Sequence, residues 1–419
     1  MSIESEGSDL STKKYIFASL TALALTIVLV ALPGEADAAR PDDPPANQAA
    51  TPTTDPPKPP PPRDDRLIVG YTKGADKGKV KKNAKVKAKR SFGAINAEVV
   101  TFNGSSKVKK AALKKQRGVK YVEPDYASVA AYSPNDRELR KKRQYEIYQQ
   151  GFHRAWNITR GIDRTTGKGI KVAVIDTGCD RTHPDLKRKI IKSYDFANND
   201  PYAWDDTGHG TFVTGIIGAR TNNKTGMAAA GFNTRILCAK ASNNNLMWYS
   251  DALAALKWSR NNGARVINIS FAHGEYSRAY NDMARRMWNN GINIVAAAGN
   301  TGSYEKAMYP AAFYGVTAVS AVNVHDRRWR YSSYGPYVDL AATGVSVRST
   351  TRGGGYGNWS GTSFASPTVA AQFALIKAKR NTGPNATRKR AQNRALDLGR
   401  SGRDNVFGYG RIRVGKSVR

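Results

Sequence analysis

The stretch KVAVIDTGCD, residues 171–180, combines a run of Val, Ala and Ile with an aspartate, Asp176, at its end. A continuous apolar run of this kind predicts a strand buried on both faces, as in a parallel sheet covered by helices. An aspartate at the end of such a strand is often only a cap for backbone N–H groups. It also lies where α/β folds place their chemistry. We therefore predict an α/β fold with a doubly wound, mostly parallel sheet and a candidate functional residue at its edge.

Two further motifs supply side chains that could act with Asp176. They are GHGTFVTG at 208–215, which contains His209, and GTSFASP at 361–367, which contains Ser363. Taken singly, the first is an ordinary turn, and the second is an ordinary start of an apolar helix. Together they supply Asp, His and Ser in that chain order, which is one of the orders known for a catalytic triad.

These motifs, together with INISF at 267–271 and VAAAGN at 295–300, resemble the subtilisin-like serine proteases, and the thermitase branch in particular. The resemblance implies a serine endopeptidase that acts through an acyl-enzyme, with Ser363 as nucleophile, His209 as general base and Asp176 as its partner. Asn300 and the backbone N–H of Ser363 would stabilise the oxyanion. A protein or peptide substrate would contact residues at two strand ends: Ser270, Phe271, Ala272, Ala297, Ala298 and Gly299.

The chain departs from the family pattern near these motifs. Phe212 and Thr214 replace His and Ala after the catalytic histidine, Phe364 replaces Met after the serine, and Phe271-Ala272-His273 replaces Leu-Gly-Gly. Two glycines would let a substrate approach the backbone closely, so their loss leaves the preference of the primary pocket open. We interpret His273 as an ordinary loop histidine.

The N-terminal residues are predicted to be processed. Lys13 and Lys14 precede an apolar run from 15 to 32, and Ala36-Asp37-Ala38 has the pattern of a signal-peptide cleavage site. We predict a signal peptide at 1–39 and a secreted, extracellular protein without a stable membrane span after cleavage; an uncleaved anchor is the alternative. Residues 40–65 are Pro-rich and are expected to be an extended linker.

Residues 66–132 are predicted to form a small α+β domain, and residues 133–419 the catalytic domain. RLIVGYTKG, INAEVVTF and KYVEPDYASV have the pattern of strands, and KVKKAALKKQRG that of a basic helix. By resemblance this is a ferredoxin-like propeptide, an intramolecular inhibitor of a self-processing zymogen. Its tail, Ala130-Ala131-Tyr132, would be the first substrate, with cleavage at or near Tyr132. The basic run at 140–143 is interpreted as a solvated helix face; a second processing site is the alternative.

The catalytic segment alternates between apolar runs and amphipathic stretches. Strands are predicted at 170–176, 235–241, 265–271, 292–298, 315–322 and 338–342. Helices are predicted at 209–220, from Ser250, at 280–290 and from Ser363 to about residue 379. Of the two cysteines, Cys179 and Cys238, neither belongs to a disulfide framework, and we interpret both as small buried side chains. A single bridge and a reactive thiol are the alternatives.

Calcium is the only cofactor that the resemblance implies, in a structural role. A first site would use Asp136, Asp185 and the loop residues Arg220, Asn223, Thr225 and Met227. A second, weaker site would use Asp195, Asn198 and Asp200. The alternative is that all of these are turn and cap residues, and Lys224 in the first loop weakens the case for a cation.

The charge is what the family resemblance does not explain. The whole chain carries a net charge of +33, and residues 133–419 alone contain 44 Lys and Arg against 19 Asp and Glu. A nucleic-acid-binding protein is therefore an alternative, although the basic residues are dispersed and no motif for nucleic acid occurs. A catalytically inactive relative is a second alternative, but all three triad members and Asn300 are present. We also expect acidic substrates or other polyanions to be attracted in a salt-dependent way.

Overall fold

The computed structural model describes residues 62–126 and 133–419. The predicted signal peptide, nearly all of the Pro-rich linker and the tail Ala130-Ala131-Tyr132 lie outside these residues. The described residues form a small N-terminal domain and a large α/β domain, each with its own buried core. No helix in these two ranges combines the length and the apolar character needed to cross a bilayer.

The small domain is a four-stranded antiparallel sheet with two helices. Its elements follow each other as β1 (Arg66–Tyr71), α1 (Lys77–Ala84), β2 (Lys87–Phe92), the short helix η1 (Gly93–Ile95), β3 (Ala97–Thr101), α2 (Ser106–Lys114) and β4 (Val119–Pro124). The strand order β2-β3-β1-β4 and the βαββαβ sequence are those of a ferredoxin-like fold, as predicted. Its core includes Leu67, Val69, Val100 and Leu113.

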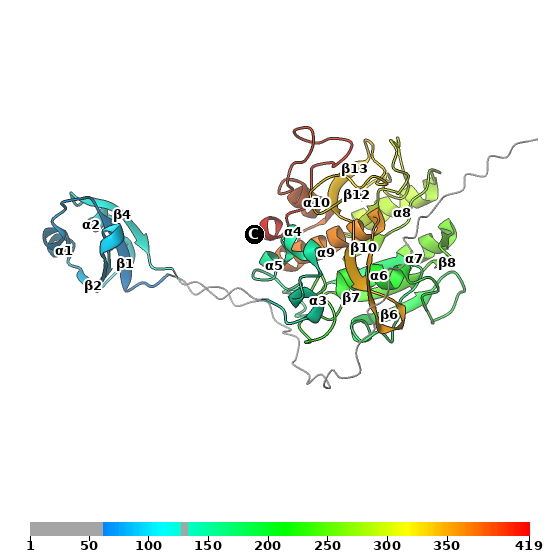
Figure 1. Ribbon diagram of the computed structural model, residues 1–419, viewed down its shortest axis with the longest axis horizontal. Coiled ribbons are helices and arrows are strands. Elements are labelled where there is room, and N and C mark those ends of the chain that lie inside the picture. The colour runs from blue at the N-terminus through cyan, green and yellow to red at the C-terminus, as the bar shows by residue number, and fades with distance from the viewer. Residues whose placement is uncertain (1–61, 127–132) are drawn as a thin grey trace, which may run out of the picture. The chain divides into compact units, whose positions relative to one another are not determined.

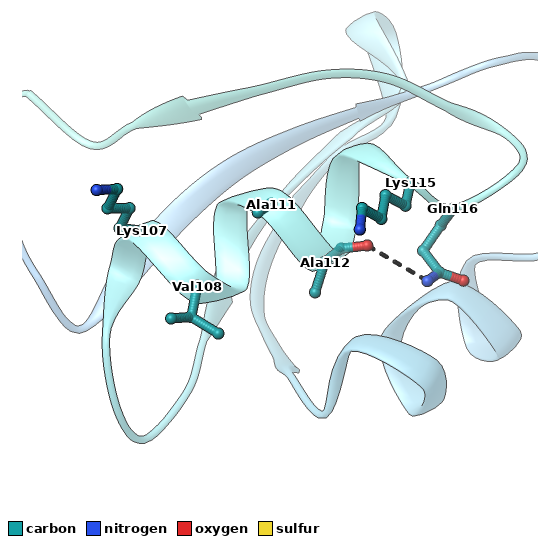
Figure 2. Close-up of a pocket in the computed structure, with 6 residues that line it drawn as sticks. All are labelled: Lys107, Val108, Ala111, Ala112, Lys115 and Gln116. Carbon is teal, nitrogen blue, oxygen red and sulfur yellow. Dashed lines mark hydrogen bonds between the residues drawn. The ribbon is translucent and has the colours of Figure 1, made fainter.

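One helix of this domain has a groove on its outer side. Figure 2 shows Val108, Ala111 and Ala112 along α2, with Lys107 at one end and Lys115 and Gln116 at the other. The Gln116 side chain donates a hydrogen bond to the carbonyl oxygen of Ala112 (3.3 Å), which extends the last turn of the helix. Val108 is 64% exposed, so this face is solvated rather than part of the small core.

The large domain is built on a seven-stranded parallel sheet (Figure 1). The strand order is β13-β12-β11-β10-β5-β7-β6. The strands are β5 (Lys171–Asp176), β6 (Ile190–Asp195), β7 (Arg235–Lys240), β10 (Val266–Ile269), β11 (Asn293–Ala297), β12 (Val316–Val322) and β13 (Val338–Thr343). Six of the seven were predicted within two residues at each end, and β6 was missed. The doubly wound α/β prediction is therefore confirmed.

Helices cover both faces of this sheet, because alternate residues of its central strand enter different cores. Val172 and Val174 of β5 pack in the core that includes α6 (His209–Gly218) and α9 (Thr362–Arg380). Ala173 and Ile175 pack in the core that includes α7 (Tyr249–Asn261) and α8 (Arg278–Asn289). The remaining elements are α3 (Arg137–Arg140), α4 (Tyr145–Gln149), α5 (Phe152–Ala155), β8 (Ser242–Asn243), β9 (Leu246–Met247), β14 (Val347–Thr350), η2 (Arg352–Gly354), β15 (Tyr356–Trp359), α10 (Pro384–Gln392) and α11 (Val414–Ser417).

The two cysteines are joined in a disulfide, so their interpretation as unpaired buried side chains is wrong. Cys179 lies in the loop after β5, and Cys238 lies on the neighbouring strand β7 opposite Val174. Both are at most 1% exposed. Sequence spacing could not show the bond, because it depends on β5 and β7 being adjacent in the sheet.

Candidate active site

Three chain segments meet at the carboxyl edge of the sheet, where β5 and β10 are neighbours and β11 lies beside β10. Asp176 is the last residue of β5, Ser270 directly follows β10, and Asn300 follows β11 after a short turn. Helices α6 and α9 begin at this edge with His209 and with Thr362-Ser363. The topology therefore brings the predicted site residues together from five separate parts of the chain.

His209 and Asp176 form a buried, charge-assisted pair. The Nδ1 atom of His209 lies 2.7 Å from Oδ1 of Asp176, which also accepts the backbone N–H of Thr177 at 2.8 Å. Burial lowers the pKa of the His209 imidazole, but the charge and hydrogen bond of Asp176, with a contribution from Asp205, outweigh burial and raise the pKa above 6.5. The pair fixes which ring nitrogen carries the proton and leaves Nε2 to face the site.

Ser363 lies in the first turn of α9, next to His209. Its hydroxyl donates to the carbonyl oxygen of Ser270 (3.1 Å), and the Ser270 hydroxyl donates to the carbonyl oxygen of Ser363 (2.9 Å). The residues that follow these two serines, Phe271 and Phe364, both pack against the His209 ring. The first turn of α9, which carries Ser363, is therefore near the imidazole, and the Ser363 hydroxyl is hydrogen-bonded to the Ser270 carbonyl oxygen.

The side chain of Asn300 is oriented by the residue that precedes Ser363. Its Oδ1 atom accepts the backbone N–H of Thr362 (3.0 Å) and the Thr362 hydroxyl (2.7 Å). Oδ1 is used in this way, and Nδ2 donates no hydrogen bond to a described residue. An amide N–H group is the kind of donor that a growing negative charge on a substrate oxygen would need.

The predicted substrate-contacting residues lie on two adjacent strand ends. Ile269 of β10 pairs with Ala296 of β11, so Ser270, Phe271 and Ala272 leave the sheet beside Ala297, Ala298 and Gly299. The Tyr337 hydroxyl donates to the carbonyl oxygen of Ala298 (2.7 Å) and braces this wall. His273 is tied into its own loop, because its backbone pairs with Tyr309 and its Nδ1 accepts the N–H of Glu275.

Comparison with known protein families identifies the family of this chain. A profile of the subtilase family matches residues 167–410, which span all three triad positions and Asn300. The chain belongs to the subtilase family. It is a subtilisin-like serine endopeptidase, and a profile of the fervidolysin N-terminal prodomain matches residues 49–125.

The relatives of this subtilase include a thermophilic serine proteinase and thermitase. The chain is 41% identical over 300 residues to the thermophilic serine proteinase of Bacillus sp. (strain AK1), covering 70% of this chain and 71% of the relative. It is 33% identical over 288 residues to thermitase of Thermoactinomyces vulgaris, covering 68% and 99%. The crystal structure of fervidolysin from Fervidobacterium pennivorans superposes with a TM-score of 0.60 and 24% identity, covering 85% of this chain and 61% of that one.

Sequence motifs did not single out Asp205, which this subtilase buries beside the triad. Its carboxylate accepts the Thr177 hydroxyl (2.7 Å) and the backbone N–H groups of Gly208 (2.8 Å) and Thr211 (2.7 Å). It therefore caps the start of α6 and links that helix to the residue after Asp176. The position four residues before His209, with three small or polar residues between, was the available signal.

The first predicted calcium loop holds two buried carboxylates. Asp136 accepts the N–H of Asn222 (2.8 Å), and Asp185 accepts the Asn223 amide (2.7 Å), the N–H of Met227 (2.9 Å) and the Tyr356 hydroxyl (2.8 Å). Both are 0% exposed. Burial raises the pKa of Asp136 to about 7, with a further contribution from the charge of Asp185, and burial also raises the pKa of Asp185.

This donor set fits a divalent cation in chemistry. Neither carboxylate forms an ion pair with a described residue. The carbonyl oxygens of Arg220, Thr225 and Met227 accept no hydrogen bond from the described part of the chain. Oxygen ligands of these two kinds are what Ca²⁺ prefers. The same residues contain only two acidic side chains, and residues 62–126 and 133–419 contain no cluster of three or more His, Cys, Asp or Glu suited to a metal.

The second predicted calcium loop does not fit a cation. Lys240, the last residue of β7, is 5% exposed and places its ammonium 3.2 Å from Asp195 and 2.6 Å from Asp206. Asp195 also accepts the Asn198 amide (2.8 Å), and Asp200 accepts the N–H of Tyr202. Burial lowers the pKa of Lys240, but Asp206 and Asp195 outweigh it and raise the pKa, so the lysine stays charged. The ammonium already supplies the positive charge that a metal would bring.

Proposed function

We propose that Ser363, His209 and Asp176 form the catalytic triad of this serine endopeptidase. The single observation that carries the proposal is the 2.7 Å His209–Asp176 hydrogen bond at the sheet edge where α9 presents Ser363. Rotation of the Ser363 side chain away from the Ser270 carbonyl would bring its Oγ toward Nε2 of His209. Nε2 would then accept the hydroxyl proton as Oγ attacks the peptide carbonyl.

The remaining steps use groups at the same edge. The tetrahedral oxyanion would accept hydrogen bonds from Nδ2 of Asn300 and from the backbone N–H of Ser363. The imidazolium, stabilised by Asp176, would give its proton to the leaving amine, which yields the acyl-enzyme. Water activated by His209 would then release the acid. The extended substrate would lie along the strand ends at 270–272 and 297–299.

We also propose that the chain is exported as a self-processing precursor. The apolar run at 15–32, the cleavage pattern at 36–38 and the prodomain support a signal peptide, secretion and an inhibitory propeptide removed near Tyr132. The basic run at 140–143 is mostly exposed, with Arg143 paired to Glu138 (3.4 Å), which suits a solvated face. The net charge of the catalytic segment would attract acidic substrates over about one Debye length, ~10 Å at 0.1 M salt.

Calcium, where bound, would be held by Asp136, Asp185 and the loop at 220–227. It would neutralise two buried carboxylates and tie the segment before α3 to the loop after α6, which is a structural role. We assign no cation to the loop at 195–200, because Lys240 lies there.

Replacement of Ser363 tests the proposed function. Processed wild type should hydrolyse an unstructured protein and a neutral peptide, and Ser363→Ala should lower kcat by about four orders of magnitude or more. The Ser363→Ala precursor should also keep its propeptide. Ser193→Ala, which removes a hydroxyl from the distant edge strand β6, should change neither result. Equal hydrolysis by Ser363→Ala, or an inactive wild type, would contradict the triad; nucleic-acid retention by both forms would favour the binding-protein alternative.

A further inference from the structure

Two aromatic rings contact the imidazole of His209. The Phe271 ring lies 5.8 Å from it, centroid to centroid, at an interplanar angle of 71°. The Phe364 ring lies 5.6 Å away at 47°. Phe271 comes from the end of β10 and Phe364 from the first turn of α9, so the two rings approach from different elements.

Phe364 is held by two further rings. It lies 4.8 Å from Phe212 and 5.8 Å from Trp359. Phe212 and Trp359 themselves stack at 4.4 Å with planes only 3° apart. All three are nearly buried, at 0%, 8% and 4% exposed for Phe212, Trp359 and Phe364. The position of the Phe364 ring is therefore fixed by packing on the side away from His209.

These rings unite departures from the family pattern that are unrelated along the chain. Phe212, Phe271 and Phe364 each stand where the subtilisin pattern has a different residue, His, Leu and Met. In the fold, Phe212 and Phe364 form one aromatic cluster with Trp359, and Phe271 lies apart from it, against the other core. Both Phe364 and Phe271 contact the imidazole of His209, which indicates a shared role for the two rings.

The imidazole needs such support on its second side. Asp176 holds Nδ1, but Nε2 makes no hydrogen bond to any described residue, so one contact alone defines the tilt of the ring. The charged groups that act on the ring are Asp176 and Asp205, and none belongs to the aromatic cluster. A general base must be held close to its reacting geometry, because a displacement of about 1 Å can cost about a hundredfold in rate.

We propose that Phe271 and Phe364 are positioning residues for His209, and that Phe212 and Trp359 brace Phe364. Their rings limit the swing of the imidazole and hold Nε2 toward the hydroxyl of Ser363. The inference rests on the proposed triad, since an imidazole that accepts no proton from Ser363 would need no such support.

Methionine replacements separate positioning from packing. Methionine fills nearly the volume of phenylalanine without a rigid ring. Phe364→Met and Phe271→Met should each lower kcat about fivefold on a neutral peptide, because the loss falls on the chemical step. KM should stay within about twofold for Phe364→Met, since Phe364 is not one of the predicted substrate-contacting residues. The double variant should lose less than the product of the two, since either loss already frees the imidazole. Phe373→Met is the control: Phe373 is fully buried in the same helix and has no ring contact with His209.

Each measurement uses processed enzyme, with active sites counted by a serine-directed acylating reagent and thermal midpoints recorded beside the kinetics. An equal fall in kcat for Phe373→Met, or a changed KM with unchanged kcat for both site variants, would overturn the positioning role. Unchanged kinetics in both variants would also overturn it while leaving the triad intact. An inactive wild type would instead overturn the proposed function itself.

Discussion

Two acidic loops of the catalytic domain solve the same electrostatic problem in different ways. In one, Asp136 and Asp185 are fully buried, and no described cationic side chain pairs with either carboxylate. In the other, Asp195 is equally buried, but Lys240 reaches it at 3.2 Å. Burial raises the pKa of Asp136 to about 7, whereas beside Asp195 the ammonium of Lys240, the last residue of β7, supplies a positive charge.

The comparison shows why a loop's acidic residues alone do not define a metal site. Carboxylates without an internal counter-charge depend on a cation from solution, so we expect calcium there. Carboxylates beside a buried lysine have an internal counter-charge and need no cation from solution. The stability of one loop should therefore follow the metal concentration, and that of the other should depend on a single side chain.

The largest expected effect comes from removal of the internal cation. Lys240→Met leaves Asp195 buried and without its counter-charge, which typically costs about 3 to 5 kcal/mol of unfolding free energy. Denaturant unfolding of the Ser363→Ala background, in which autolysis is absent, measures the loss. Lys192→Met removes an exposed lysine from β6 and should cost less than about 0.5 kcal/mol. Similar values for the two variants would show that the buried pair contributes little.

A smaller effect is expected from removal of calcium. Chelation should lower the thermal midpoint by about 5 °C or more, since a ligand at about 100 times its Kd adds about 2.7 kcal/mol. Asp136→Asn, which keeps an acceptor oxygen but removes a charge, should shrink the difference between chelated and calcium-saturated samples. Asp200→Asn, in the loop at 195–200, should leave this difference as it is in the wild type. A thermal midpoint that changes with neither chelator nor added calcium would contradict the proposed calcium site in the first loop.

The smallest effect concerns Asp205, which precedes the Lys240 partner Asp206 in the sequence and caps the start of α6. Activity requires neutral His209, and the pKa of His209 is raised, so activity should fall as the pH drops through a value above 6.5. Asp205→Asn removes one of the negative charges that raise this pKa. The acid limb of kcat/KM should then move to lower pH by less than about one unit. Asp200→Asn should not move it, and a shift to higher pH for Asp205→Asn would contradict the assignment.

The sequence predicted the parallel sheet because its strands are continuous apolar runs. It missed β6, whose polar second half, Lys192-Ser193, belongs to a half-exposed edge strand. It also missed α1 and β2 of the small domain, where lysines outnumber apolar residues and hide the periodicity. The periodicity of apolar residues along the sequence reflects which side chains are buried. Elements that bury few side chains therefore have no recognisable pattern.

Within the candidate site, the motifs predicted the triad positions and Asn300, and the structure brings Asp176 and His209 together, but the motifs did not single out the groups around them. Lys240 looked like the polar end of a strand, and its partners Asp195 and Asp206 are distant in sequence. The rings of Phe212, Phe271 and Phe364 were visible only as isolated departures from the family. Their contacts depend on which strands and helices are neighbours in space, and no local pattern encodes that.

The Cys179–Cys238 disulfide turns one part of this protease into a covalent ring. The ring contains His209, the whole of α6 and the exposed turn at Lys224-Thr225. Molecules of a protease cut one another, and exposed turns are the preferred points of attack. A cut at Lys224 would open the backbone, but both fragments would stay joined through the sulfur atoms. The bond therefore protects the histidine-bearing segment against loss by autolysis as well as against unfolding.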